Sequence, residues 1–136
     1  MPSFSYLKKI YYKDIDQMGL VYYSRYFEFF EEARTELLNN MGIKVTTIED
    51  LGYFLPVTSA TCDYKEGAKL EDIIIVKTVL QRMIGIKLKI VYEIYRKSDS
   101  HLLVSGHTMH VFTDKKGAPK RPPKFFIEKF KLISHD

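Results

Sequence analysis

The sequence predicts an α+β fold in which an antiparallel sheet wraps around one long helix. Three observations support this: one segment has apolar residues at three- and four-residue steps, four later segments are extended or alternating, and short polar turns join them. Short turns permit only antiparallel neighbours, because parallel strands need a crossover of a dozen or more residues. At 136 residues, the chain has a length typical of a single domain, which we expect to span residues 1–136.

The first strand and the long helix are the earliest elements along the chain. Residues 4–12 are rich in aromatic residues and predict a strand, and a polar, turn-prone segment follows over residues 13–19. Gly42 stands where a left-handed residue would end the helix. A broad apolar stripe of this kind requires a large partner surface, most simply the face of a sheet. The stripe consists of Tyr22, Tyr23, Tyr26, Phe27, Phe30, Ala33, Leu37, Leu38 and Met41.

Extended patterns dominate the rest of the chain. The segment Thr46–Glu49 resembles a capping box for a short helix that Gly52 would end. Because short turns join the next four strands, we predict that they form an antiparallel meander. These strands are expected over residues 54–64, 72–82, 86–94 and 102–113, with a last short helix over 124–132.

Charge and targeting signals limit the partners and the location. The net charge of +4, from 21 basic and 17 acidic residues, suits an anionic partner such as a phosphate-bearing molecule better than nucleic acid. The first twelve residues lack the apolar core of a signal peptide, and no apolar run is long enough to cross a bilayer. We therefore expect a cytoplasmic protein with no membrane span.

Several catalytic and metal sites are disfavoured by the sequence. The single cysteine, Cys62, excludes a disulfide within the chain and a cysteine-based metal site. There is no Gly-x-Ser-x-Gly elbow and no Walker-type phosphate loop. We expect no metal, because the histidines do not have the spacing of a helical zinc site; they are His101, His107, His110 and His135.

Two acidic residues, Asp14 and Asp16, lie in the turn immediately before the long helix. One interpretation is that they are caps or solvated turn residues. The other is catalytic: a carboxylate would act as base or nucleophile, and the unpaired N–H groups that begin the helix would hold a developing oxyanion. The pattern alone leaves both interpretations open.

This region resembles the signature of the 4-hydroxybenzoyl-CoA thioesterase family, especially its branch of Tol-Pal-associated acyl-CoA thioesterases. The resemblance rests on the Asp14-Ile15-Asp16 triplet, the run from Gly19 to Tyr23, Tyr26, and the run from Phe30 to Glu36. It implies a hotdog fold and hydrolysis of an acyl-CoA to free acid and coenzyme A. It also implies a homodimer or homotetramer with the site at a subunit interface, and no bound cofactor, since coenzyme A belongs to the substrate.

The resemblance also assigns roles to residues. Asp16 would be the catalytic base or nucleophile, and the backbone N–H of Tyr23 would polarise the thioester carbonyl. Gly19 would let the backbone approach the substrate closely. Tyr22 and Tyr26 would line the acyl pocket, chiefly as packing residues.

The sequence departs from the family pattern at three places. Arg25 replaces the usual asparagine, and Gly67 replaces a frequent proline. Where the 4-hydroxybenzoyl enzyme has a basic run that holds coenzyme A phosphates, only Arg82 keeps the charge. Other cations could contribute to phosphate binding, although a solvated surface is the simpler interpretation for them: Lys115, Lys116, Lys120 and Arg121.

Two other functions remain open beside acyl-CoA hydrolysis. The chain could be an acyl carrier protein thioesterase or a non-catalytic acyl-CoA binding module. A hotdog dehydratase is disfavoured, because such enzymes are expected to need a histidine on the long helix, and this helix has none. The acyl group of the substrate is not specified by the sequence.

Overall fold

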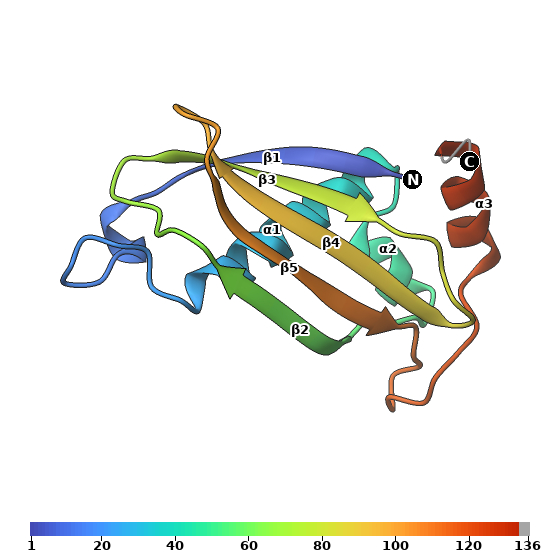
Figure 1. Cartoon of the computed structure of the whole chain (residues 1–136). Coiled ribbons are helices and arrows are strands. Elements are labelled where there is room, and N and C mark those ends of the chain that lie inside the picture. The colour runs from blue at the N-terminus through green and yellow to red at the C-terminus, as the bar shows by residue number, and fades with distance from the viewer. Residues whose placement is uncertain (134–136) are drawn as a thin grey trace.

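The computed structural model describes residues 1–133 and contains one five-stranded antiparallel sheet, with the long helix against one face of it (Figure 1). This arrangement confirms the predicted fold class. His135, considered above as a metal ligand, lies outside the described residues. The strands are β1 (Ser3–Lys9), β2 (Val57–Tyr64), β3 (Ile73–Leu80), β4 (Lys87–Arg96) and β5 (Leu102–Val111). The helices are α1 (Arg25–Asn40), α2 (Val45–Asp50) and α3 (Lys124–Ile133), with a 3-10 turn η1 at Tyr12–Asp14.

The strand order is β1–β3–β4–β5–β2, which corrects part of the predicted meander. β3, β4 and β5 do form a meander, but β2 pairs with β5 instead of β3, and β1 takes the place beside β3. The reason lies in the connection between β2 and β3. This connection does not turn back as a hairpin but runs past the start of α1, where the Val21 N–H donates to the Ala68 carbonyl at 2.9 Å.

Helix α1 begins later than the apolar stripe suggested. Tyr22 and Tyr23 precede its first residue, Arg25, and are 58% and 68% exposed. Backbone pairing causes this, because the Tyr22 N–H donates to the Asp14 carbonyl at 3.0 Å and keeps the chain extended there. The predicted end of the helix is confirmed, since Gly42 has φ of +77° and follows the last turn.

Helix α2 also differs from its predicted start. It begins at Val45, and the residue before it, Lys44, makes no side-chain capping bond. Thr46 is therefore inside the helix, and the predicted capping box was wrong. The predicted end holds, because Gly52 adopts φ of +86°.

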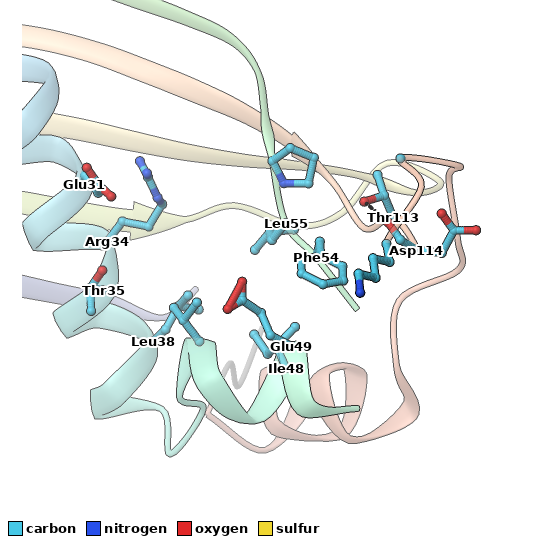
Figure 2. Close-up of a pocket in the computed structure, with 14 residues that line it drawn as sticks. Glu31, Arg34, Thr35, Leu38, Ile48, Glu49, Phe54, Leu55, Thr113 and Asp114 are labelled. Carbon is cyan, nitrogen blue, oxygen red and sulfur yellow. Dashed lines mark hydrogen bonds between the residues drawn. The ribbon is translucent and has the colours of Figure 1, made fainter. Parts of the chain in front are cut away.

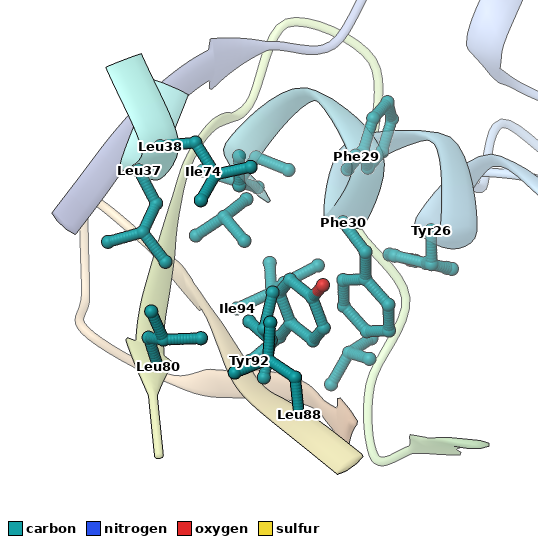
Figure 3. Close-up of a cluster of buried hydrophobic side chains, with 14 of the residues drawn as sticks. Tyr26, Phe29, Phe30, Leu37, Leu38, Ile74, Leu80, Leu88, Tyr92 and Ile94 are labelled. Atoms are coloured by element: carbon teal, nitrogen blue, oxygen red, sulfur yellow. The ribbon is translucent and has the colours of Figure 1, made fainter. Parts of the chain in front are cut away.

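The core lies between α1 and the covered face of the sheet (Figure 3). Along β3 and β4 every second side chain is buried, as expected for strands with one covered face. Phe30 of α1 stacks on Tyr92 of β4 with ring centroids 4.2 Å apart and planes at 9°. The α1 side of the core consists of Tyr26, Phe29, Phe30, Ala33, Leu37 and Leu38.

Gly106 of β5 makes this close packing possible. A Cβ atom at this position would lie 2.3 Å from the Thr61 carbonyl oxygen and 3.0 Å from the Phe30 ring. Glycine is therefore required here because neighbouring atoms approach closely on two sides. The backbone conformation is not the reason, since the φ of Gly106 is not left-handed.

Candidate active site

The loop between η1 and α1 is closed on itself and carries Asp16. Ile15 bridges Val21, and the Asp16 N–H donates to the Leu20 carbonyl at 2.8 Å. The Gly19 N–H donates to the Asp16 carbonyl at 3.1 Å, and Gly19 has φ of +79°, a conformation that glycine adopts without steric cost. The conformation of the turn is therefore enough to explain a glycine at position 19. Its close approach to the substrate remains a prediction.

The Asp16 carboxylate is held by its own loop and keeps one oxygen free. Oδ1 accepts the N–H of Met18 at 2.8 Å and that of Leu20 at 3.2 Å. Within residues 1–133, Oδ2 has no hydrogen-bond or ion-pair partner, and the side chain is exposed. The two bonds to Oδ1 orient the carboxylate. The free oxygen can take a proton from a water molecule or attack an electrophile.

The chain entering α1 presents an unpaired backbone donor. The Tyr22 N–H is taken by the Asp14 carbonyl, and the Arg25 N–H donates to the Tyr22 carbonyl at 2.9 Å. The Tyr23 N–H has no acceptor in the described part of the chain. Donors at a helix start lack intrahelical partners and lie at the positive end of the helix dipole. The Tyr23 N–H can therefore stabilise negative charge that develops on an oxygen.

Asp14 has a structural role in the same region. It is 3% exposed, and its Oδ2 accepts the Tyr11 N–H at 3.0 Å. Arg25 donates to the Lys13 carbonyl at 3.2 Å and pairs with Glu28 at 3.0 Å. These contacts fix η1 against the start of α1.

Three tyrosines pack together along the site, from the exposed Tyr23 and Tyr64 to the buried Tyr26. The Tyr64 ring lies 5.0 Å from that of Tyr23 and 5.6 Å from that of Tyr26. The Tyr64 hydroxyl donates to the Tyr23 carbonyl at 3.3 Å, which helps to orient the peptide group adjoining the free N–H. The Tyr26 side chain is 2% exposed, and its hydroxyl accepts the Ala68 N–H at 3.1 Å.

These groups surround one cavity of about 290 Å³. Of the residues predicted for the site, Asp16, Tyr22, Tyr23 and Tyr26 line it, and Gly19 belongs to the loop beside it. Asp16, which carries the free carboxylate oxygen, and Tyr23, which carries the free backbone N–H, therefore line the same cavity. Its complete lining is Asp16, Met18, Leu20, Val21, Tyr22, Tyr23, Tyr26, Tyr64, Lys65, Glu66 and Gly67.

The far wall of the cavity comes from the β2–β3 connection, which Arg96 holds in place. The Arg96 side chain is 11% exposed and donates to Asp72 at 3.1 Å, to Asp99 at 2.9 Å and to the Gly67 carbonyl at 3.4 Å. It also pairs with Glu66 at 3.4 Å. Sequence reasoning missed these wall residues because the contacts join positions about 30 apart in the chain, and no local pattern signals them.

Arg82 does not lie at this cavity. It belongs to the β3–β4 turn and lines a different cavity of about 420 Å³, together with Met83 and residues of α3. β1 leads into the Asp16 loop from the opposite end of β3, since Lys9 pairs with Ile73 (Figure 1). At a rise of about 3.3 Å per residue, Arg82 is about 25–30 Å from that end of the sheet.

Another cavity, of about 490 Å³, lies between α1, α2 and the start of β2 (Figure 2). Behind it a chain of hydrogen bonds crosses the core: Arg34 donates to the Tyr92 hydroxyl at 3.1 Å, and Tyr92 contacts Thr108 at 2.7 Å. Thr108 contacts His110 at 2.8 Å. Burial, and then the charge of Arg34, lower the pKa of His110 to about 4, so it is neutral near pH 7. This chain is a satisfied structural network, and we assign it no catalytic role.

Residues 1–133 contain no group of three or more histidine, cysteine, aspartate or glutamate side chains arranged to hold a metal ion. None of the described helices is long and apolar enough to cross a membrane.

Comparison with known proteins establishes the family. Residues 11–130 match the family described as the thioesterase-like superfamily. The chain belongs to this family. An acyl-CoA thioesterase, YbgC of Haemophilus influenzae, is 32% identical over 134 residues, covering 98% of this chain and 95% of the relative. These matches confirm the family that the residues around Asp16 resemble.

Solved structures confirm the hotdog fold. A DHNA-CoA thioesterase from Staphylococcus aureus has a TM-score of 0.90 at 23% identity, and the match covers 98% of this chain and 91% of that one. A 4-hydroxybenzoyl CoA thioesterase has a TM-score of 0.87 at 18% identity, with 95% and 99% covered.

Proposed function

We propose that this protein is an acyl-CoA thioesterase, with Asp16 as base or nucleophile and the Tyr23 backbone N–H as the carbonyl polariser. The observation that carries the proposal is that the free Asp16 Oδ2 and the free Tyr23 N–H belong to residues lining one cavity. The names of the relatives support the substrate class, since YbgC of Haemophilus influenzae is an acyl-CoA thioesterase.

The chemistry follows from these two groups. The thioester carbonyl oxygen accepts the Tyr23 N–H, and the carbonyl carbon becomes more electrophilic. In one route Asp16 removes a proton from water, the hydroxide adds to the carbonyl, and the tetrahedral oxyanion is held by the N–H. The C–S bond then breaks, and the coenzyme A thiolate receives the proton. In the other route Asp16 attacks directly, coenzyme A leaves, and water hydrolyses the resulting anhydride.

The decisive experiment measures release of free thiol from short, long and aromatic acyl-CoAs. Asp16→Asn keeps the size and the Oδ1 contacts but removes the charge, and we expect at least about a 100-fold loss of kcat/KM. Asp50→Asn, on the exposed side of α2, is the matched control and keeps the wild-type rate. Wild-type rates in Asp16→Asn would refute the catalytic assignment. Binding without thiol release by the wild type would instead indicate a binding module.

We also propose that the active form is a homodimer or a larger homo-oligomer. β2 is an edge strand whose first five residues are exposed, so its outer backbone groups are free to pair with a second copy. Light scattering should give at least twice the chain mass of 16.0 kDa. Since Arg82 and Asp16 lie near opposite ends of the sheet in one chain, we infer that the predicted contact with coenzyme A phosphates comes from the Arg82 of a second copy. A monomer in solution would refute both ideas.

A further inference from the structure

The Tyr26 hydroxyl is a buried donor without an acceptor. Its oxygen accepts the Ala68 N–H at 3.1 Å, but among residues 1–133 nothing accepts the hydroxyl hydrogen. The side chain is 2% exposed and lines the Asp16 cavity. Burial raises the pKa of Tyr26, so the hydroxyl stays protonated and able to donate. A buried donor without a partner is costly, so an occupant of the cavity that accepts this hydrogen is favoured.

The position of this donor indicates which part of a substrate meets it. Asp16 is exposed and Tyr23 is 68% exposed, so the reacting carbonyl lies near the mouth. Tyr26 is one helical turn further along the chain and almost fully buried, so it lies on the inner side. The coenzyme A portion is too large for about 290 Å³ and must extend outward, which leaves the inner side to the acyl group.

The walls also restrict the acyl group. A volume of about 290 Å³ is at or below the usual range for small-molecule sites of about 300–1,000 Å³. The Tyr64 ring, which belongs to the lining, lies 5.6 Å from the Tyr26 ring. The inner side therefore fits a short chain or a single ring.

From these observations we propose that Tyr26 is a specificity-determining residue, whose hydroxyl donates a hydrogen bond to a hydroxyl or keto oxygen on a small acyl group. This inference rests on the proposed thioesterase function and deepens it. Water in the free cavity can accept the Tyr26 hydrogen. A substrate that displaces this water without supplying an oxygen leaves the donor unpaired and reacts less well.

The test compares pairs of acyl-CoAs that differ only by one oxygen: butyryl with 3-hydroxybutyryl, and benzoyl with 3- and 4-hydroxybenzoyl. We expect the wild type to have about tenfold higher kcat/KM for an oxygenated member of at least one pair. Tyr26→Phe should abolish this preference. A purely structural role, through the Ala68 N–H, would lower both members of a pair equally.

The matched control is Tyr6→Phe, which also removes one tyrosine hydroxyl bond, here to Glu32 at 2.7 Å on a different part of the fold. It should keep the wild-type preference. A wild type without any preference, or a preference that survives in Tyr26→Phe, would overturn the proposal.

A binding measurement covers two other cases: Tyr26→Phe does not fold, or no acyl-CoA is hydrolysed. In wild-type protein labelled with ¹³Cζ-tyrosine, binding of an oxygenated product acid should shift a buried tyrosine resonance. The deoxy acid should not shift it. Equal responses would refute the role of Tyr26. Absence of thiol release with this selective shift would refute the proposed hydrolysis but support the hydrogen bond.

Discussion

We expect the free energy of unfolding to fall when the pH is lowered from 7 to 5, because of His110, the single buried histidine among residues 1–133. Its Nδ1 lies 3.3 Å from the Leu55 carbonyl, which can only accept, so Nδ1 carries the hydrogen. Nε2 therefore accepts from the Thr108 hydroxyl at 2.8 Å. Both ring nitrogens therefore make the hydrogen bonds of the neutral form of histidine. Burial, followed by the charge of Arg34, lowers the pKa from 6.5 to about 4.

The sign and size of the effect follow from this pKa. In the unfolded chain the histidine takes a proton near pH 6.5, whereas in the folded chain it does so only near pH 4, so acid favours unfolding between these values. The loss is about 2 kcal/mol between pH 7 and pH 5, and reaches about 3.4 kcal/mol below pH 4. For 136 residues, with an unfolding entropy of about 2.1 cal/mol/K each, the loss at pH 5 corresponds to a Tm lower by about 6–7 °C.

Urea denaturation of the wild type and of His110→Gln at pH 7 and pH 5 measures this directly. Glutamine stays neutral at both values and can both donate and accept, so the variant should lack the loss of about 2 kcal/mol. Groups that titrate elsewhere contribute equally to both proteins. His107→Gln is the control, since His107 is only half-buried, and it should behave as wild type. If His110→Gln and the wild type lose the same stability on acidification, the neutral assignment of His110 is wrong.

Three further predictions concern other parts of the molecule. Arg82→Ala should raise KM for acyl-CoAs. It should not raise KM for thioesters of N-acetylcysteamine, because these lack the phosphates. Equal effects on the two kinds of substrate would exclude a phosphate contact. Gly106→Ala should destabilise the fold by about 1–3 kcal/mol in thermal or urea unfolding, because the added Cβ would clash with the Thr61 carbonyl. Arg96→Met should cost about 1.5–3 kcal/mol and lower kcat/KM, because it releases the β2–β3 connection that forms the cavity wall. Normal kinetics in Arg96→Met would show that the wall does not depend on this residue.

Local signals explain which elements could be predicted from the sequence. The ends of α1 and α2 were predictable because the left-handed residue that follows a helix is usually glycine, and Gly42 and Gly52 are visible in the sequence. The buried face of β4 was predictable from simple alternation. The start of α1 was not, because an apolar stripe cannot show that the Tyr22 N–H is already bonded to Asp14. Hydrophobic spacing fixes the face of a helix, while its first residue depends on backbone partners outside it.

Sheet order and the wall of the candidate site depend on contacts between distant residues. The residues of β2 do not indicate whether its partner is β3 or β5. The one related feature is on β5, where Gly106 lies opposite Cys62 of β2 and leaves room for the close approach of the two strands. The resemblance to the family indicated Asp16 and Tyr23, because their proposed roles depend on a motif within eight residues. Arg82, chosen from the same resemblance, lies at the other end of the sheet in this chain, so a motif can identify a residue without placing it.

Tyr26 shows how burial and function can act on one side chain. Its spacing in the apolar stripe predicted a packing residue, and at 2% exposure it does pack. Yet packing alone requires only the ring, and phenylalanine would supply the same ring without a polar atom to desolvate. The hydroxyl accepts one backbone donor 42 residues away, its own hydrogen has no acceptor among residues 1–133, and Tyr26 lines the cavity. Burying a hydroxyl costs free energy unless it is hydrogen-bonded, and the bond from the Ala68 N–H lowers this cost. The hydroxyl hydrogen remains unused. In our proposal, an oxygen of the acyl group accepts it.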